Sequence, residues 1–398
     1  ISVEFNHPIW VLFSSGTTGK PKAITHSTGG ILIEQYKSHS LHQNISEGDR
    51  FFWNTTTGWM MWNYAIGSLL CGAKLCLYDG AANFPDIGVQ WRFAKSVKIN
   101  HFGNGSPLFI ASMKQNIKDV NNEDLNCIKT IGATGSPLSV EAFEWIQKKL
   151  PNAQIISLSG GTDICSAFIG GCTKLPVYSG FLQCNMLGAS IEAWNENGES
   201  VELITGELVI TEPLPSMPLF FWGDNDFKKY HDSYFNKNEG VWTHGDWIFI
   251  DKNKGILMQG RSDATLNRNG IRIGTSEIYS VLDKLKEVKD SLIIDLKINN
   301  SSKLILFIQT TSNLNNELKS KIHNLIKTKC SPRHTPNLIF SVSQIPYTIS
   351  GKKMEIPIKK ILLGQKVTNV ISKGAMKNPE CIDEFIGIKN QYLKSLDQ

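Results

Sequence analysis

Residues 14–22 constrain the fold more than any other part of the chain, because they join an apolar strand to a loop that can enclose an anion. The apolar run at residues 10–13 indicates a buried strand, and glycine, serine, threonine and lysine fill the loop that follows. Glycines let backbone N–H groups surround a phosphate, hydroxyls add neutral donors, and lysines add charge. The loop is not a Walker motif, since Pro21 follows Lys20 where that motif has Ser or Thr. Taken alone, it predicts a phosphate site, with a mobile surface loop as the alternative.

Apolar segments alternate with helix-like segments up to about residue 180, and that alternation is typical of layered α/β folds. A helix is predicted over residues 27–42, where apolar residues recur at helical spacing. Further strands in this part are predicted at residues 74–78, 128–131 and 154–157. A β-rich subdomain is predicted next, because short segments separated by Gly, Asn and Pro occur at residues 207–211, 247–251 and 255–259.

The last third of the chain predicts a small α+β unit. Its expected elements, in order, are a helix at 276–288, strands at 291–298 and 303–310, a helix at 315–327 and a strand at 337–342. The tail from 378 to 398 has the pattern of a polar amphipathic helix. We therefore predict two domains, a large one over residues 1–262 and a small one over residues 263–398.

Composition excludes several classes of protein. The 398 residues include 41 basic and 36 acidic side chains, and the net charge of +5 is not concentrated in a basic block, which disfavours nucleic acid as a partner. No apolar run approaches the roughly 18 residues of a membrane span, and no signal peptide is visible. The eight cysteines are scattered without metal-ligand spacing, which favours reduced thiols and a cytosolic location. No obligatory protein partner is indicated.

Five further motifs follow the loop in order. They are Gly160-Gly161-Thr162-Asp163, His244-Gly245-Asp246, Gly260-Arg261-Ser262-Asp263, residues 267–272, and Ser350-Gly351-Lys352. Together with the loop they resemble the signature motifs of the acyl-adenylate-forming superfamily, the AMP-binding acyl-CoA synthetases and their relatives. The resemblance covers nearly the whole chain. It implies a large adenylation domain, a small mobile C-terminal domain, and two half-reactions: an acid and ATP give an acyl-adenylate and pyrophosphate, and a thiol then displaces AMP.

The resemblance implies a role for each motif in handling ATP. The loop would hold the phosphates through residues Ser15, Gly16, Thr17, Thr18, Gly19 and Lys20. Lys22 would join them, and Thr162 would donate to the α-phosphate. Asp163 stands where most of the superfamily has the glutamate that binds Mg²⁺, and it is one methylene shorter. The alternative for Asp163 is a helix cap.

The remaining implied roles concern the nucleoside, coenzyme A and the reacting acid. Asp246 and Arg261 would contact the ribose. The other residues implied in binding are Gly135, Ser136 and Pro137 against the adenine, Asn267 and Arg272 at the nucleotide, and Gly270 beside the pantetheine of coenzyme A. Asp263 falls at the hinge position. Lys352 would bridge the attacking carboxylate and the α-phosphate, offsetting charge in the transition state. Its alternative is a solvent-exposed lysine in a Ser-Gly turn.

The segments between the motifs resemble the acetoacetyl-CoA synthetases in particular. That similarity lies at residues 51–63, 159–165, 215–218 and 260–268. It implies acetoacetate as the acid. At Gly160 the acetyl-CoA synthetases have a tryptophan that closes the acyl pocket, so glycine would leave room for a longer acid. The alternative is that Gly160 only shapes a turn, and pocket size does not separate acetoacetate from butyrate or 3-hydroxybutyrate.

The chain opens at Ile1 without methionine, and the resemblance implies a further N-terminal segment that would complete the large domain. Two hypotheses follow. The chain belongs to an active acetoacetate–CoA ligase, or it is a truncated, non-catalytic fragment that binds nucleotide or nothing. Within the enzyme class, the alternative is another short- or medium-chain or aryl acyl-CoA synthetase.

Overall fold

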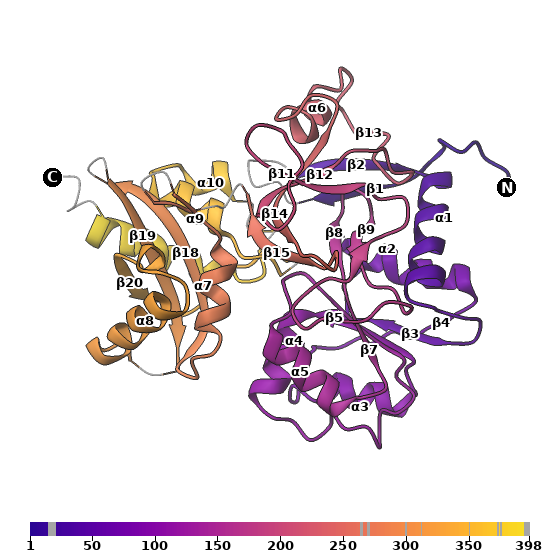
Figure 1. The fold of residues 1–398 in the computed structure, drawn as a ribbon, viewed down its shortest axis with the longest axis horizontal. Helices are drawn as coiled ribbons and strands as arrows, with labels where there is room; N and C mark the ends of the chain where they lie inside the picture. Colours follow the sequence, from indigo (N-terminus) through magenta and orange to yellow (C-terminus); the bar gives the residue numbers. More distant parts are fainter. Residues whose placement is uncertain are drawn as a thin grey trace. The chain divides into compact units, whose positions relative to one another are not determined.

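The structure is a computed structural model, drawn in Figure 1, and it forms two compact units. It describes residues 1–14, 21–262, 266–268, 271–298, 301–311, 313–349, 351–371, 374 and 376–393. The first unit comprises mainly Ile1–Ser14, Lys22–His244 and Ile248–Met258. The second comprises mainly Gly245–Trp247 and Gln259–Gln398.

A five-stranded parallel sheet lies in the first unit, with strand order β4-β3-β5-β6-β7. Its strands are β3 (Arg50–Trp53), β4 (Lys74–Leu75), β5 (His101–Gly105), β6 (Thr130–Thr134) and β7 (Gln154–Ser157). The predicted strand at 74–78 is thus only two residues long. The strands from β4 to β7 are connected by the helices α3 (Val89–Ser96), α4 (Ser106–Lys114) and α5 (Val140–Lys149).

Helices cover both faces of this sheet, which confirms the predicted α/β layering. On one face, α3, α4 and α5 cover the sheet and form a core with it (Figure 1). In that core the ring of Trp91 stacks on Phe102, with 4.5 Å between centroids. On the other face, Phe51 and Trp53 of β3 pack with α2 (Met60–Gly67). Helix α1 (Thr28–Tyr36) precedes α2 and continues into a π-helical segment, Lys37–His42, as predicted for residues 27–42.

Three antiparallel sheets lie wholly or mainly in the first unit, and the third of them agrees with the predicted β-rich part. The first contains β1 (Pro8–Ser14), β2 (Lys22–Ser27) and β13 (Phe220–Phe221). The second contains β8 (Ser159–Gly161), β9 (Ser166–Gly170) and β10 (Cys184–Asn185). The third contains β11 (Ile191–Trp194), β12 (Gly206–Ile210), β14 (Trp242–Ile250) and β15 (Ile256–Arg261). Helix α6 (Lys228–Tyr234) lies between β13 and β14 in sequence.

The second unit is a sheet covered by helices on both faces. Its sheet has β18 (Val288–Ile298) and β19 (Ser301–Thr310) antiparallel, with β20 (Leu338–Ser341) parallel to β19. Helices α7 (Thr275–Leu282) and α8 (Asn316–Lys329) share one core with the sheet. Helices α9 (Glu355–Leu362), α10 (Val367–Val370) and α11 (Ile382–Ile388) share the other. A short pair, β16 (Leu266–Arg268) and β17 (Ile271–Ile273), precedes α7.

The helix predicted at 276–288 is shorter in the structure, since α7 ends at Leu282. The apolar spacing of Leu282, Leu285 and Val288 suits a helix, but a turn follows α7, and Val288 begins β18 opposite Thr310. Sheet pairing of a buried β-branched residue therefore overrides helical periodicity at this point. The predicted tail helix is found over its described part as α11 and a π-helical segment, Lys389–Leu393, while residues 394–398 lie outside the described residues.

Two findings bear on the class of protein. Within the described ranges, none of the helices has the length and apolar character needed to cross a membrane. All eight cysteines are free thiols.

Candidate functional site

Two side chains from distant parts of the first unit meet at the carboxylate of Asp163. Lys22, the first residue of β2, places its Nζ 2.7 Å from Oδ1 of Asp163. Tyr234, the last residue of α6, donates its phenolic hydrogen to the same oxygen. Asp163 itself lies in the turn between β8 and β9 and caps no helix. The predicted loop lysine and the predicted metal ligand are therefore direct neighbours.

The carboxyl group of Asp163 is held in its ionised form. Burial alone would raise its pKa, but the ammonium group of Lys22 and the nearby His244 act in the opposite direction, as do the hydrogen bonds from Lys22 and Tyr234. The net result is a pKa of Asp163 well below its usual range. The site thus presents a permanent negative charge beside a positive one.

Aromatic packing fixes the Tyr234 ring. Trp242 stacks on it with 3.5 Å between ring centroids, and Phe221 packs edge-on at 5.7 Å. The Nζ of Lys22 also lies 4.7 Å from the centroid of Tyr234, which adds a cation–π attraction. Tyr234 is only 4% exposed, so its hydroxyl has few alternatives to Asp163.

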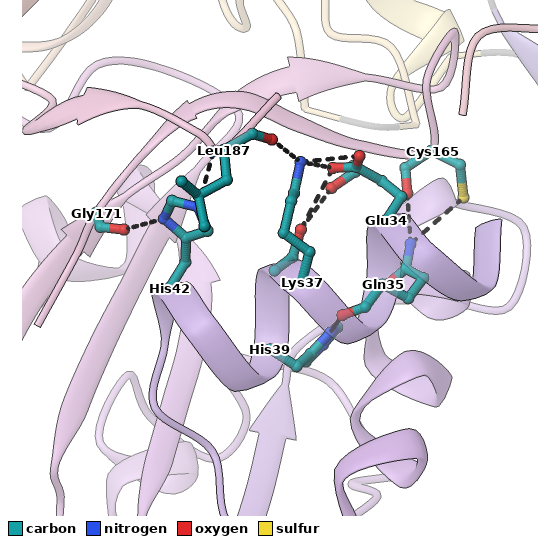
Figure 2. Close-up of polar contacts among 10 residues, drawn as sticks. Glu34, Gln35, Lys37, His39, His42, Cys165, Gly171 and Leu187 are labelled. Carbon is teal, nitrogen blue, oxygen red and sulfur yellow. Dashed lines mark hydrogen bonds and ion pairs between the residues drawn. The ribbon is translucent and has the colours of Figure 1, made fainter. Parts of the chain in front are cut away.

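The turn that carries Thr162 and Asp163 is anchored by the elements that follow the predicted phosphate loop. The Nε2 atom of His26, in β2, donates to the Asp163 carbonyl oxygen at 2.9 Å. The Nε2 atom of Gln35, in α1, donates to the Cys165 carbonyl oxygen at 2.5 Å, as Figure 2 shows. Cys165 has φ of 49°, a strained value for a non-glycine residue, and this bond helps to hold it.

Helix α1 and the π-helical segment that continues it bury further polar groups (Figure 2). Lys37 and Glu34 form an ion pair at 2.7 Å, and Lys37 also donates to the Leu187 carbonyl. His39 and His42 donate through Nδ1 to the carbonyl oxygens of Gln35 and Gly171, both at 2.8 Å. Because a carbonyl oxygen can only accept, both rings are in the tautomer with the hydrogen on Nδ1.

These buried neutral histidines are expected to make the protein sensitive to acid. Burial lowers the pKa of His39 from 6.5 to about 4, so the unfolded chain binds more protons below pH 6.5 and stability is lost as pH falls toward 4. His39 alone should lower the free energy of unfolding by about 2 kcal/mol between about pH 7.5 and 5. The measurement is denaturant unfolding at the two pH values. The difference in the free energy of unfolding between the two pH values should be smaller by about that amount in His39→Asn, whose amide can replace the Nδ1 donor.

A matched control is His231→Asn. His231 is 59% exposed in its side chain, so the pH dependence of this variant should equal that of the parent chain. An unchanged pH dependence in His39→Asn would contradict the account.

The predicted ribose residues meet in the second unit. Asp246 and Arg261 approach to 3.5 Å between Oδ2 and Nη1, and Asp246 is the more buried of the two. Gly245 has φ of +87°, and a Cβ there would lie 2.9 Å from the Arg261 guanidinium. The backbone conformation before Asp246 therefore favours glycine, whereas the flexible end of the Arg261 side chain could move aside for a Cβ.

The predicted adenine loop follows β6 at its carboxyl end, where open parallel sheets bind ligands. Gly135 has φ of +88°, and Gly135, Ser136 and Pro137 are all exposed. Ser106 fixes the loop, because its hydroxyl donates to the Ser136 carbonyl at 2.6 Å. The loop is therefore both anchored and accessible.

The other predicted residues are placed less fully. Lys352 is exposed in a turn of the second unit. Asn267 and Arg272 are paired across β16 and β17, and only their backbone is described. The predicted residues that lie outside the described part of the chain are Ser15, Gly16, Thr17, Thr18, Gly19, Lys20, Asp263 and Gly270.

A divalent cation fits the Asp163 site only if other groups, such as water and substrate phosphates, supply most of its ligands. Among the described residues, no group of three or more His, Cys, Asp or Glu could hold a metal ion. Asp163 offers one carboxylate whose Oδ1 is occupied by Lys22 and Tyr234, while no described residue donates to Oδ2. A single carboxylate oxygen suits Mg²⁺, which takes most of its ligands from water and substrate phosphates.

Sequence reasoning missed Tyr234, His26 and Gln35. Each acts on the Asp163 turn from more than 70 positions away in the chain, and none belongs to a recognisable motif. The clustering of Tyr230, Tyr234 and Phe235 near Trp242 was the only available signal, and it indicates packing rather than a site.

The chain is similar to known proteins over nearly its whole length. A family model described as AMP-binding enzyme matches residues 2–217. An acetoacetyl-CoA synthetase of Gallus gallus is 42% identical over 391 residues, which are 97% of this chain and 58% of that protein. One of Rhizobium meliloti (strain 1021) is 41% identical over 390 residues, 97% of this chain and 60% of that protein. The chain thus spans less than two thirds of these relatives.

Solved structures give the same picture. The acetoacetyl-CoA synthetase from Streptomyces lividans matches with a TM-score of 0.92 and 39% identity, covering 98% of this chain and 60% of that one. An anthranilate CoA ligase in complex with anthranoyl-AMP matches with a TM-score of 0.77 at 20% identity, over 90% of this chain and 68% of that one. The latter likeness concerns the fold alone.

Proposed function

This chain belongs to the AMP-binding enzyme family, and from that premise we propose that it forms the greater part of an acetoacetate–CoA ligase. The observation that carries the proposal is its identity of 41–42% with acetoacetyl-CoA synthetases over 97% of its length. The fold and the Lys22–Asp163 site support the same conclusion. Another short- or medium-chain acid is the alternative substrate.

The first step is an attack by a carboxylate oxygen of acetoacetate on the α-phosphorus of ATP. The bond from the α-phosphorus to the bridging oxygen breaks, and pyrophosphate leaves with that oxygen. Anions approach each other in this step, so fixed positive charges should lower its barrier. We assign that part to Lys22 and Lys352, with Thr162 donating to the α-phosphate. Mg²⁺, when bound with ATP, would neutralise phosphate charge beside Asp163.

The second step joins the acyl group to coenzyme A. The thiol sulfur attacks the acyl carbon of the adenylate, the acyl–oxygen bond breaks, AMP leaves, and the thiol proton goes to solvent. We propose that residues 263–398 move as a small domain between the two steps, about a hinge at Asp263, with Gly270 leaving room for pantetheine. Asp246 and Arg261 would bind the ribose throughout.

The proposal for nucleotide binding also includes the remaining predicted residues. The loop Ser15–Lys20 would enclose the phosphates, the exposed loop after β6 would pack on adenine, and Asn267 and Arg272 would contact the nucleotide. We also propose the cytosol as the location, since eight free thiols suit a reducing compartment.

Product analysis tests the proposed reaction. The chain is incubated with ATP, Mg²⁺, acetoacetate and coenzyme A, and the products are identified by mass spectrometry. Acetoacetyl-CoA and AMP should appear in equal amounts and only when all substrates are present. Formation of ADP, or acetoacetate-independent release of AMP, would contradict an adenylating ligase.

Tyr234→Phe tests whether the Asp163 site serves adenylation. The variant keeps the stacked ring and removes one hydrogen bond to a charged, mostly buried carboxylate, which is worth about 1.5–3 kcal/mol. We expect acetoacetate-dependent ATP–pyrophosphate exchange to fall by about tenfold or more. Tyr230→Phe is the matched control, because Tyr230 shares α6 and the aromatic cluster but makes no hydrogen bond to Asp163 within the described chain. Equal exchange rates in the two variants would contradict a role for Tyr234 in this site.

A further inference from the structure

The turn that carries Lys352 is the tip of a small hairpin in the second unit. Tyr347 and Lys353 face each other as an antiparallel bridge. Thr348 closes the turn, because its N–H donates to the Lys352 carbonyl at 2.9 Å and its hydroxyl accepts from the Lys352 N–H at 3.0 Å. Gly351 has φ of +78°. Lys352 is therefore presented by a hairpin whose two ends are Tyr347 and Lys353.

A single carboxylate holds both ends of this hairpin. Asp290, near the start of β18, accepts the Tyr347 hydroxyl hydrogen through Oδ2 at 2.7 Å. Its Oδ1 lies 2.9 Å from the Nζ of Lys353. Both partners of this ion pair are mostly buried, with side-chain exposure of 19% for Lys353 and 23% for Asp290. The two neighbouring lysines thus differ, since Lys352 is exposed and Lys353 is turned inward.

Further contacts keep Lys353 in place. Its Nζ donates to the Ser291 carbonyl and lies 3.8 Å from the centroid of the Tyr279 ring. Tyr279 is itself fixed, since its hydroxyl donates to Glu355 at 3.0 Å and accepts from the Ile293 N–H at 3.1 Å. The hairpin is therefore tied to β18, α7 and α9 at once.

We propose that Asp290 and Lys353 are positioning residues for Lys352, which they hold in the geometry needed for adenylation by clamping both ends of its hairpin to β18. This inference rests on the proposed function, which gives Lys352 its part in the first half-reaction. Burial and the charge of Asp290 raise the pKa of Tyr347, so its phenol stays a hydrogen donor to the clamp.

Hydrogen exchange, read by mass spectrometry on the full chain, tests the clamp without requiring turnover. The variant is Asp290→Asn, with Lys353→Met as a second one. Amides of Thr348, Gly351 and Lys352 should exchange at least about tenfold faster in both variants, while amides of α8 keep their rates. Unchanged hairpin exchange, or equal acceleration in α8, would overturn the proposal.

The matched control is a second ion pair on the same strand. Asp295 of β18 binds Lys359 of α9 at 2.6 Å, away from the hairpin. Asp295→Asn removes an equivalent charge and should leave hairpin exchange unchanged. Acceleration in this variant as large as in Asp290→Asn would also overturn the proposal, since it would show a general loss of structure.

The half-reactions supply the functional readout. Asp290→Asn should lower ATP–pyrophosphate exchange at least about tenfold while thioester formation from supplied acyl-adenylate stays within about twofold. Equal loss in both half-reactions would reject the positioning role. Lys352→Ala separates the two hypotheses: if it leaves adenylation intact, the proposed function of Lys352 fails, whereas loss in Lys352→Ala with full activity in Asp290→Asn rejects only the clamp.

Discussion

Lys352→Ala is expected to lower acetoacetate-dependent ATP–pyrophosphate exchange by about 10²–10³-fold, while ATP binding stays within about twofold. The carboxylate of the acid and the α-phosphate of ATP are both anionic, so their approach requires a positive charge that acts mainly in the transition state. Removing one preorganised donor of this kind costs about 2.7–4 kcal/mol. Because ground-state ATP is held by other groups, its affinity should change little.

The control for this variant is Lys366→Ala, which removes another exposed lysine of the second unit and should leave exchange unchanged. ATP affinity is measured by equilibrium binding and exchange with labelled pyrophosphate. An equal loss of ATP binding and exchange in Lys352→Ala would contradict its assigned role. That pattern is typical of a group that stabilises bound ATP and the transition state equally.

Gly160→Ala is expected to destabilise the first unit by about 3 kcal/mol or more. Gly160 lies in β8, where the ladder to β9 shifts register, and is not in a turn. A Cβ at this position would lie 2.1 Å from the Ser166 carbonyl oxygen and 2.5 Å from the Ala167 Cα. Both atoms belong to the backbone, so neither can move aside without separating β8 from β9.

The matched control is the next residue. A Cβ on Gly161 would lie 3.3 Å from the Asp163 carboxylate and 3.9 Å from both the Asp163 backbone nitrogen and the His244 ring, so Gly161→Ala should cost far less stability. Thermal unfolding of both variants is the measurement. Similar unfolding midpoints for the two variants would show that β9 can shift at little cost, and would contradict the argument that its backbone excludes a side chain at Gly160.

This geometry refines the interpretation of Gly160 as a pocket residue. The absence of an indole still agrees with a longer acid, but the glycine also serves the packing of two strands. We therefore expect that Gly160→Trp would unfold this region and would not change the preferred acid to acetate.

Local sequence was sufficient for much of the fold. The strand predicted at residues 10–13 forms as β1, but its predicted burial was wrong, since Phe13 is 67% exposed. Helix α1 forms where helical spacing indicated a helix, with Ser27 as its N-cap, and the alternation of strands and helices gives the parallel sheet. These features depend on side-chain periodicity and capping, which act within a few residues. Where two local patterns compete, as at Val288, tertiary pairing decides and the prediction was wrong.

The candidate site was predictable only where a motif carried it. Lys22 and Asp163 stand 141 positions apart, yet each belongs to a motif, and the structure brings them to 2.7 Å. Tyr234, Asp290 and Lys353 have no such signal, because their roles arise from a partner distant in sequence. Gly160 shows the same limit, since the atoms that exclude a side chain belong to another strand.

ATP–pyrophosphate exchange on this chain, with acetoacetate, acetate, butyrate or no acid, is the most direct measurement of the central claim. We expect exchange that depends on acetoacetate and exceeds that with the other acids, which would establish both the adenylation chemistry and the substrate. Exchange that is no greater with acetoacetate than with acetate or butyrate, or that is absent with every acid, would contradict the assignment of this chain as an acetoacetate-activating ligase.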